Sequence, residues 1–128
     1  MENVEASTSG HAKRRDIRER SAAFCDRCIQ VVLHLPDNGV CWEIGRQLTR
    51  SSGSVGANIE EAQGTTSRSD FAYRMSVALR EARETYYWLQ RVRNNRLLQP
   101  ERLGPLLGES NEIVAILTTI VKNARKQS

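Results

Sequence analysis

The sequence predicts an all-α protein that folds as an antiparallel, up-down-up-down four-helix bundle. Apolar residues recur at steps of three and four in four segments of the 128-residue chain, the spacing that lines one face of a helix. Short segments rich in glycine, proline, serine or asparagine separate them, and no segment alternates as a strand does. Short connections between helices of similar length favour antiparallel neighbours.

The first predicted helix runs from about Arg14 to His34. Residues 1–12 are polar and lack apolar periodicity, so we expect a mobile tail there and one bundle domain over residues 13–128. The turn at residues 35–39, Leu-Pro-Asp-Asn-Gly, ends the helix. Its apolar stripe consists of Ile17, Phe24, Cys28, Val31 and Leu35.

The second predicted helix covers about Val40 to Gln63. Gly64 follows it and can adopt the left-handed conformation that ends many helices. The stripe of this helix consists of Ile44, Leu48, Ser51, Val55, Ile59 and Ala62.

The third predicted helix covers about Arg68 to Arg96, and a fourth follows it. Ser67 can accept a hydrogen bond from a free backbone N–H, and Asp70 suits the positive helix end. The third stripe consists of Phe71, Met75, Ala78, Ala82, Tyr86 and Leu89. Pro100 is suited to the first turn of the fourth helix, but Pro105 removes a backbone donor. We expect Pro105 to kink this helix or to move its start to about Pro105. Its stripe consists of Leu103, Leu107, Ile113, Leu117, Ile120 and Ala124.

The segment from Arg46 to Leu89 contains two specific motifs. The first comprises Gln47, Leu48, Arg50, Ser51, Ser54, Asn58, Ile59, Glu61, Ala62, Gly64, Ser67, Asp70 and Phe71. The second comprises Ala78, Leu79, Glu81, Ala82, Glu84, Trp88 and Leu89. With these motifs the segment resembles the bacterial four-helix-bundle family of ribosomal-RNA intervening-sequence proteins, and the likeness extends over roughly Arg15 to Arg125. The resemblance implies a homo-oligomer, a ring-like pentamer. It also points to a reverse transcriptase or another protein as partner, because a related group of proteins are accessory to reverse transcriptases of diversity-generating retroelements.

Composition indicates an ordinary globular chain. It is 39% hydrophobic and 27% charged, and no apolar run approaches the roughly 20 residues of a membrane span. The first twelve residues lack the apolar core of a secretory signal, so we expect a cytoplasmic protein without a membrane partner. The odd number of cysteines, three, suits a reducing compartment.

Surplus apolar and small residues favour self-association. The first helix carries a second stripe of Ala22, Cys25, Ile29 and Leu33 beside its core stripe. The second helix is rich in small residues despite the roughly 1 kcal/mol that each interior glycine costs relative to alanine. Both features can instead tighten the intramolecular core. The small residues of the second helix are Ser51, Ser52, Gly53, Ser54, Gly56 and Ala57.

Positive charge is concentrated in the third helix. Residues 67–98 contain seven arginines and three carboxylates, whereas the whole chain has a net charge of +4. Arginine interleaved with tyrosine can bind phosphates and stack on bases, which predicts an RNA- or DNA-binding face. The alternative is a solvated face or a subunit contact, with Arg80 and Glu84 forming an i,i+4 pair. The candidate binding residues, on the helix face opposite the core stripe or at its edge, are Arg80, Arg83, Tyr87 and Arg91, with Tyr73 beyond them.

Asn58 falls near the apolar stripe of the second helix, where an unpaired amide would cost about 1 to 3 kcal/mol. We therefore expect it to bond with Ser54 or with a polar group of the third helix. Glu61 is expected to join this network, which would specify helix register or oligomer state.

No catalytic residue, metal site or cofactor is predicted. The Cys25-x-x-Cys28 spacing lies inside an apolar helix without a second pair, which favours a role in the core. A di-iron bundle needs paired Glu-x-x-His motifs, and neither His11 nor His34 supplies one. We therefore expect a non-enzymatic oligomeric binding or assembly module for structured RNA or DNA. The alternatives are a purely structural homo-oligomer or protein adaptor, and an enzyme with an unrecognised site. The glutamates considered as metal ligands are Glu60, Glu61, Glu81 and Glu84.

Overall fold

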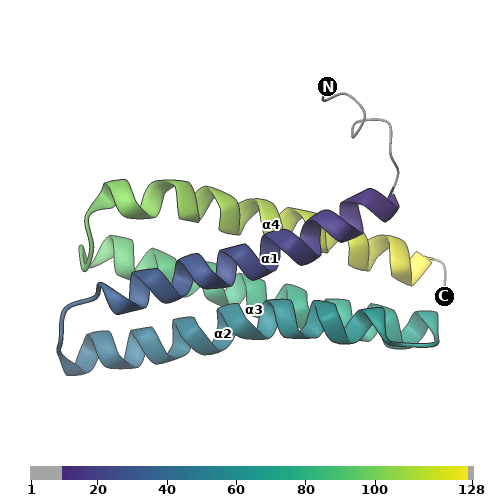
Figure 1. The fold of residues 1–128 in the computed structure, drawn as a ribbon, viewed down its shortest axis with the longest axis horizontal. Helices are drawn as coiled ribbons and strands as arrows, with labels where there is room; N and C mark the ends of the chain where they lie inside the picture. Colours follow the sequence, from purple (N-terminus) through teal and green to yellow (C-terminus); the bar gives the residue numbers. More distant parts are fainter. Residues whose placement is uncertain (1–9, 127–128) are drawn as a thin grey trace.

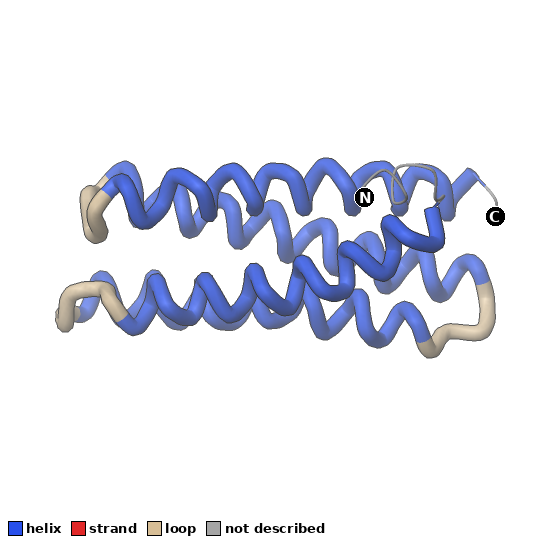
Figure 2. The backbone as a smooth tube through the Cα atoms, turned by 45° about the horizontal axis from the view of Figure 1, so that its top comes forward, coloured by secondary structure: helices blue, strands red, loops and turns tan. Residues whose placement is uncertain are grey.

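The computed structural model describes the backbone of residues 10–126 and the side chains of residues 17–126. The described chain forms four helices and no strand: α1 (Gly10–Leu33), α2 (Gly39–Gln63), α3 (Arg68–Asn94) and α4 (Pro100–Lys126). Figure 1 shows each helix running in the opposite direction to the one before it. Figure 2 shows that short loops at the two ends of the molecule make all three connections. The predicted all-α, up-down-up-down bundle is confirmed.

Helix starts differ slightly from the predicted ones. α1 begins at Gly10, not at about Arg14, so residues 10–12 of the predicted tail are helical. Residues 1–9, the rest of that tail, lie outside the described residues. α2 begins at Gly39 because Asn38 caps it. The Asn38 backbone is extended, and its Oδ1 accepts from the N–H of Cys41 at 2.9 Å.

Two predictions concern the turn between α2 and α3, and one is confirmed while the other is wrong. Ser67 caps α3, since its Oγ accepts from the N–H of Asp70 at 3.1 Å, as predicted. Gly64 ends α2, but its φ of −92° and ψ of −1° are right-handed, so the predicted left-handed conformation is wrong. A 3.1 Å bond from the Gly64 N–H to the Glu61 carbonyl tightens the last turn instead. Among the described non-glycine residues, a positive φ occurs only at Arg96, at 54°, just after α3.

α4 begins at Pro100 and continues through Pro105, so a start at Pro105 is wrong. Pro100 occupies the first helical position, where a missing N–H removes no intrahelical bond. Pro105 removes one bond, the one to the carbonyl of Glu101. Both Glu101 and Pro105 are exposed, so water can replace the missing donor.

The core is one cluster to which all four helices contribute. All residues of the four predicted core stripes are buried or packed against this cluster, except Ala124, which is half-buried. The helices surround the core in sequence order, and of the four contacts between neighbours the most extensive is between α2 and α3 and the least extensive between α1 and α4. Both described chain ends lie at one end of the bundle, together with the α2–α3 turn (Figure 1). Among the described helices, none is long and apolar enough to cross a membrane.

Several small residues of α2 face α1 of the same chain. A Cβ added at Gly45 would lie 3.0 Å from Cγ1 of Val32, and one at Gly56 would lie 3.5 Å from Oγ of Ser21. Gly45 and Gly56 therefore let α1 and α2 approach closely, and Gly56 is one of the small residues for which a role in the intramolecular core was the alternative. The second stripe of α1 remains largely uncovered, since Ala22 and Leu33 are exposed and Ile29 is only half-buried.

Candidate nucleic-acid interface

The predicted arginine and tyrosine residues lie on the outer face of α3. Arg80, Arg83 and Tyr87 are exposed, and Arg91 is half-buried. Tyr73 lies further along the same face and is 61% exposed. The opposite face of α3 is buried in the core, which fixes the orientation of this basic surface. We call Arg80, Arg83, Tyr87 and Arg91 the α3 basic face.

The carboxylates beside this face bind an arginine of another helix. Arg50 of α2 donates from Nη1 to Glu81 at 3.1 Å and from Nη2 to Glu84. The Trp88 indole N–H also donates to Glu84, at 3.1 Å. The Arg50 guanidinium, followed by the Trp88 N–H, holds the pKa of Glu84 below its ordinary value of 4.5.

The pair considered between Arg80 and Glu84 is therefore absent. Within residues 17–126, neither Arg80 nor Arg83 has a hydrogen-bond or ion-pair partner. Both arginines are exposed to solvent, and Arg50 of α2 offsets part of the negative charge of the two neighbouring carboxylates. The outer face of α3 thus retains its positive charge.

Tyr87 and Arg91 form a stacked pair. The Arg91 Cζ lies 4.7 Å from the centroid of the Tyr87 ring, within cation–π distance. Trp88 meets Tyr87 edge to face, with centroids 5.0 Å apart and an interplanar angle of 79°. The Nε of Arg91 is buried and has no hydrogen-bond partner among the described residues.

Asn58 makes the predicted type of contacts, whereas Glu61 lies apart from them. The Asn58 amide donates to the Ser54 carbonyl at 2.8 Å and to the Ser54 Oγ at 3.2 Å. Its Oδ1 accepts from Arg74 of α3 at 3.3 Å. Glu61 is exposed and makes none of these bonds.

The most deeply buried polar contact between α2 and α3 is a different pair, which sequence reasoning missed. Ser51 and Thr85 are both fully buried, and their hydroxyl oxygens lie 2.9 Å apart. The Thr85 hydroxyl also lies 2.8 Å from the carbonyl of Glu81. The signal was present in the sequence, since each residue lies at a position that faces the core.

The cysteines pack as small hydrophobic residues. Cys28 is buried, and burial, followed by the neighbouring Cys25, raises the pKa of its thiol to about 12. Cys25 is half-buried and lies 3.8 Å from the Ser52 hydroxyl. Glu60 pairs with Arg18, and Glu81 and Glu84 pair with Arg50. The described residues contain no group of three side chains placed to hold a metal ion.

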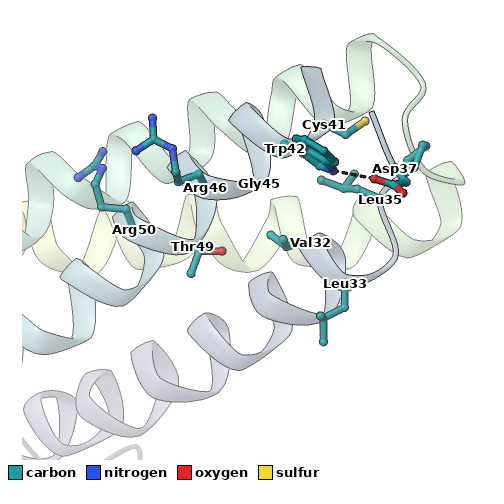
Figure 3. Close-up of a pocket in the computed structure, with 11 residues that line it drawn as sticks. Val32, Leu33, Leu35, Asp37, Cys41, Trp42, Gly45, Arg46, Thr49 and Arg50 are labelled. Atoms are coloured by element: carbon teal, nitrogen blue, oxygen red, sulfur yellow. Dashed lines mark hydrogen bonds between the residues drawn. The ribbon is translucent and has the colours of Figure 1, made fainter. Parts of the chain in front are cut away.

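An apolar hollow at the loop end of α1 and α2 was also missed. Leu33, Val40 and Trp42 are 69%, 65% and 68% exposed. Figure 3 shows Trp42 above the hollow, with its indole N–H bonded to Asp37 at 2.8 Å. Leu33 and Trp42 line this hollow together with Val32, Leu35 and Gly45, whereas Val40 lies outside its lining. Such side chains are typical of a protein contact.

Comparison with known proteins agrees with the resemblance. The sequence pattern of the 23S rRNA-intervening sequence protein family matches residues 13–119. A similar solved structure is the crystal structure of a protein of unknown function from the S23 ribosomal protein family of Bacteroides thetaiotaomicron VPI-5482. It has 32% sequence identity and a TM-score of 0.78, and the match covers 86% of this chain and 98% of that one. No curated protein matches the chain. On the match over residues 13–119, this chain belongs to the 23S rRNA-intervening sequence protein family.

Proposed function

We propose that this protein is a non-enzymatic, homo-oligomeric bundle that binds structured RNA or DNA through the α3 basic face. The observation that carries the proposal is the pair of exposed arginines, Arg80 and Arg83, that have no partner within residues 17–126. A guanidinium group can donate two parallel hydrogen bonds to a phosphate, which makes arginine a common phosphate ligand.

Three further features support a nucleic acid ligand. Arg50 offsets part of the negative charge of Glu81 and Glu84, so these carboxylates repel an approaching phosphate less. The chain is basic overall, with a net charge of +4. The family description names a ribosomal RNA, and the similar solved structure is assigned to a ribosomal protein family. A site for RNA is consistent with both descriptions.

The test is a salt titration with labelled RNA and DNA, read by fluorescence anisotropy. The variant Arg80→Ala/Arg83→Ala should weaken binding to many sequences alike. It should also flatten the plot of log K against log salt by about 0.7 to 0.9 for each phosphate that the protein no longer neutralises. The matched control is Arg102→Ala/Lys122→Ala, which removes the same charge from exposed positions on α4. Absence of binding by the unmodified protein even at low salt would refute the proposal.

A purely structural homo-oligomer is the second candidate, and the exposed side chains of Leu33, Val40 and Trp42 favour it. If subunit contacts bury the α3 basic face, Arg80→Ala/Arg83→Ala should dissociate the assembly. If the face binds nucleic acid, the variant should keep its size and lose affinity. Size-exclusion chromatography with light scattering on the same preparations distinguishes the two roles.

A further inference from the structure

We infer that the α3 basic face recognises the phosphate backbone of a double-helical nucleic acid, and that Tyr87 positions Arg91 for this contact without stacking on a base. This inference rests on the proposed function and narrows the class of nucleic acid. It assigns Tyr87 a different role from the base stacking that the sequence predicts for tyrosines on this face.

The Tyr87 ring already has a stacking partner. Arg91 lies over it at 4.7 Å, and Trp88 meets it at 79°. A base that stacks on the Arg91 side would have to displace the guanidinium group. Because the ring is also held by Trp88, it cannot turn freely to offer a new face.

The exposed tyrosines are too far apart to stack neighbouring bases of one strand. Tyr73 and Tyr87 are fourteen residues apart on α3, which corresponds to about 21 Å along the helix axis. Proteins that bind single strands combine a positive groove with aromatic side chains on which successive bases stack. The α3 basic face is the outside of a helix, and among its residues only Tyr87 is aromatic.

The arginines are suited to a regular phosphate backbone. Arg80, Arg83 and Arg91 share one helix face, and Arg91 follows Arg80 by eleven positions, which corresponds to about 16 Å along the helix axis. A double helix carries one phosphate charge for about every 1.7 Å of its axis, so a straight row of cations this long finds several phosphates within reach. An A-form RNA duplex also has a wide, shallow minor groove against which such a ridge can lie.

Tyr87 restricts Arg91 before any ligand binds. The stack on the ring and the burial of Nε limit the side chain, so less rotamer freedom is lost when its terminal nitrogens meet a phosphate. The ring is itself braced, because Arg50 and Glu84 hold the Trp88 that contacts it. Tyr87 is thus a positioning residue for Arg91.

A double-mutant cycle at Tyr87 and Arg91 tests this role. The probes are labelled RNA duplex, DNA duplex and single-stranded oligouridine of equal length, and the measurement is anisotropy over a range of salt concentrations. The proteins are the unmodified chain, Tyr87→Leu, Arg91→Met and the double variant. Tyr87→Phe is the matched control, because it keeps the ring and removes only the hydroxyl group.

We expect the duplexes to bind more tightly than oligouridine. Tyr87→Leu should weaken duplex binding roughly two- to fivefold, the effect of removing one exposed cation–π interaction. Arg91→Met should also flatten the salt slope by about 0.9. In the Arg91→Met background, Tyr87→Leu should cause no further loss of affinity. The single variant Tyr87→Phe should bind as the unmodified protein does. A loss of fold would lower helix content and melting temperature, which circular dichroism detects separately.

Two results would overturn the inference while leaving the proposed function intact. One is binding of oligouridine as tight as that of the duplexes. The other is a loss on Tyr87→Leu that persists in the Arg91→Met background, since a direct stack on a base does not depend on Arg91. Failure to bind any of the three probes at low salt would refute the proposed function as well.

Discussion

At the residue scale, the buried hydroxyl pair of Ser51 and Thr85 joins α2 to α3 inside the core. Thr85→Val keeps the shape of the side chain but leaves the buried Ser51 hydroxyl without this partner. We expect a loss of about 1 to 3 kcal/mol in the free energy of unfolding, measured by urea denaturation. Ser51→Ala/Thr85→Val removes both hydroxyl groups and should recover most of that loss. A double variant as unstable as Thr85→Val would contradict this account.

Cys28 makes the free energy of unfolding depend on pH in the alkaline range. Burial raises its pKa from 9.0 to about 12, so the folded chain holds this proton more tightly than the unfolded chain does. The stabilisation that results from this difference in pKa is fully present below pH 9.0 and is lost as the pH rises towards 12. We expect Cys28→Ala to flatten the fall in unfolding free energy over this range, with urea denaturation under reducing conditions as the measurement. Equal slopes in the two proteins would show that other groups cause the fall.

At the scale of the helices, the sequence is sufficient for the number of helices, their order and their core faces. Steps of three and four place Leu48 and Met75 in the core without knowledge of any distant contact. The cap at Ser67 is likewise local and predictable. The contacts of Arg50 with Glu81 and Glu84 join residues more than thirty positions apart, and several arginines of the chain could have made them. These contacts became apparent only from the packing of α2 on α3 in the structure.

The contact between α1 and α4 depends on a partly buried ion pair. Arg20 donates to Glu109 from Nε at 2.9 Å and from Nη2 at 2.6 Å, and to Glu112 at 2.7 Å. The Arg20 and Glu109 side chains are 26% and 21% exposed. We expect Arg20→Met to lower the unfolding free energy by about 1.5 to 3 kcal/mol. Faster amide hydrogen exchange in α1 should accompany this loss.

Arg18 provides a matched control. It also binds a carboxylate with two hydrogen bonds, to Glu60 at 3.1 and 2.9 Å, but both side chains are more exposed, at 42% and 57%. Arg18→Met should therefore cost at most about 1 kcal/mol. Arg20 lowers the pKa of Glu109 below 4.5, so its stabilising effect is present above that pH and is lost as the pH falls. The difference in unfolding free energy between Arg20→Met and the unmodified protein should therefore become smaller at acidic pH.

At the scale of the whole molecule, we expect self-association through the apolar surface that contains Leu33 and Trp42. Light scattering at micromolar concentration should give a mass near five subunits, and a persistent mass of 14.5 kDa would refute self-association. Leu33→Asp/Trp42→Ser should reduce the mass, because it removes two exposed apolar side chains and adds a charge. Tyr73→Ser/Ala115→Asp makes similar changes at exposed positions on α3 and α4 and should leave the mass unchanged.

The unequal packing around the bundle sets an order for its assembly. α2 and α3 share the largest contact and are joined by a four-residue turn, so they can form a helical hairpin at a small cost in loop entropy. We expect α4 to add to α3 next, and α1 and α4 to meet last because they come from opposite ends of the chain. The contact between α1 and α4, which Arg20 stabilises, is therefore where the folded bundle should open first. An α1 that separates from α4 exposes the apolar stripe that it normally buries in the core. From this state, two chains can exchange their α1 helices by domain swapping.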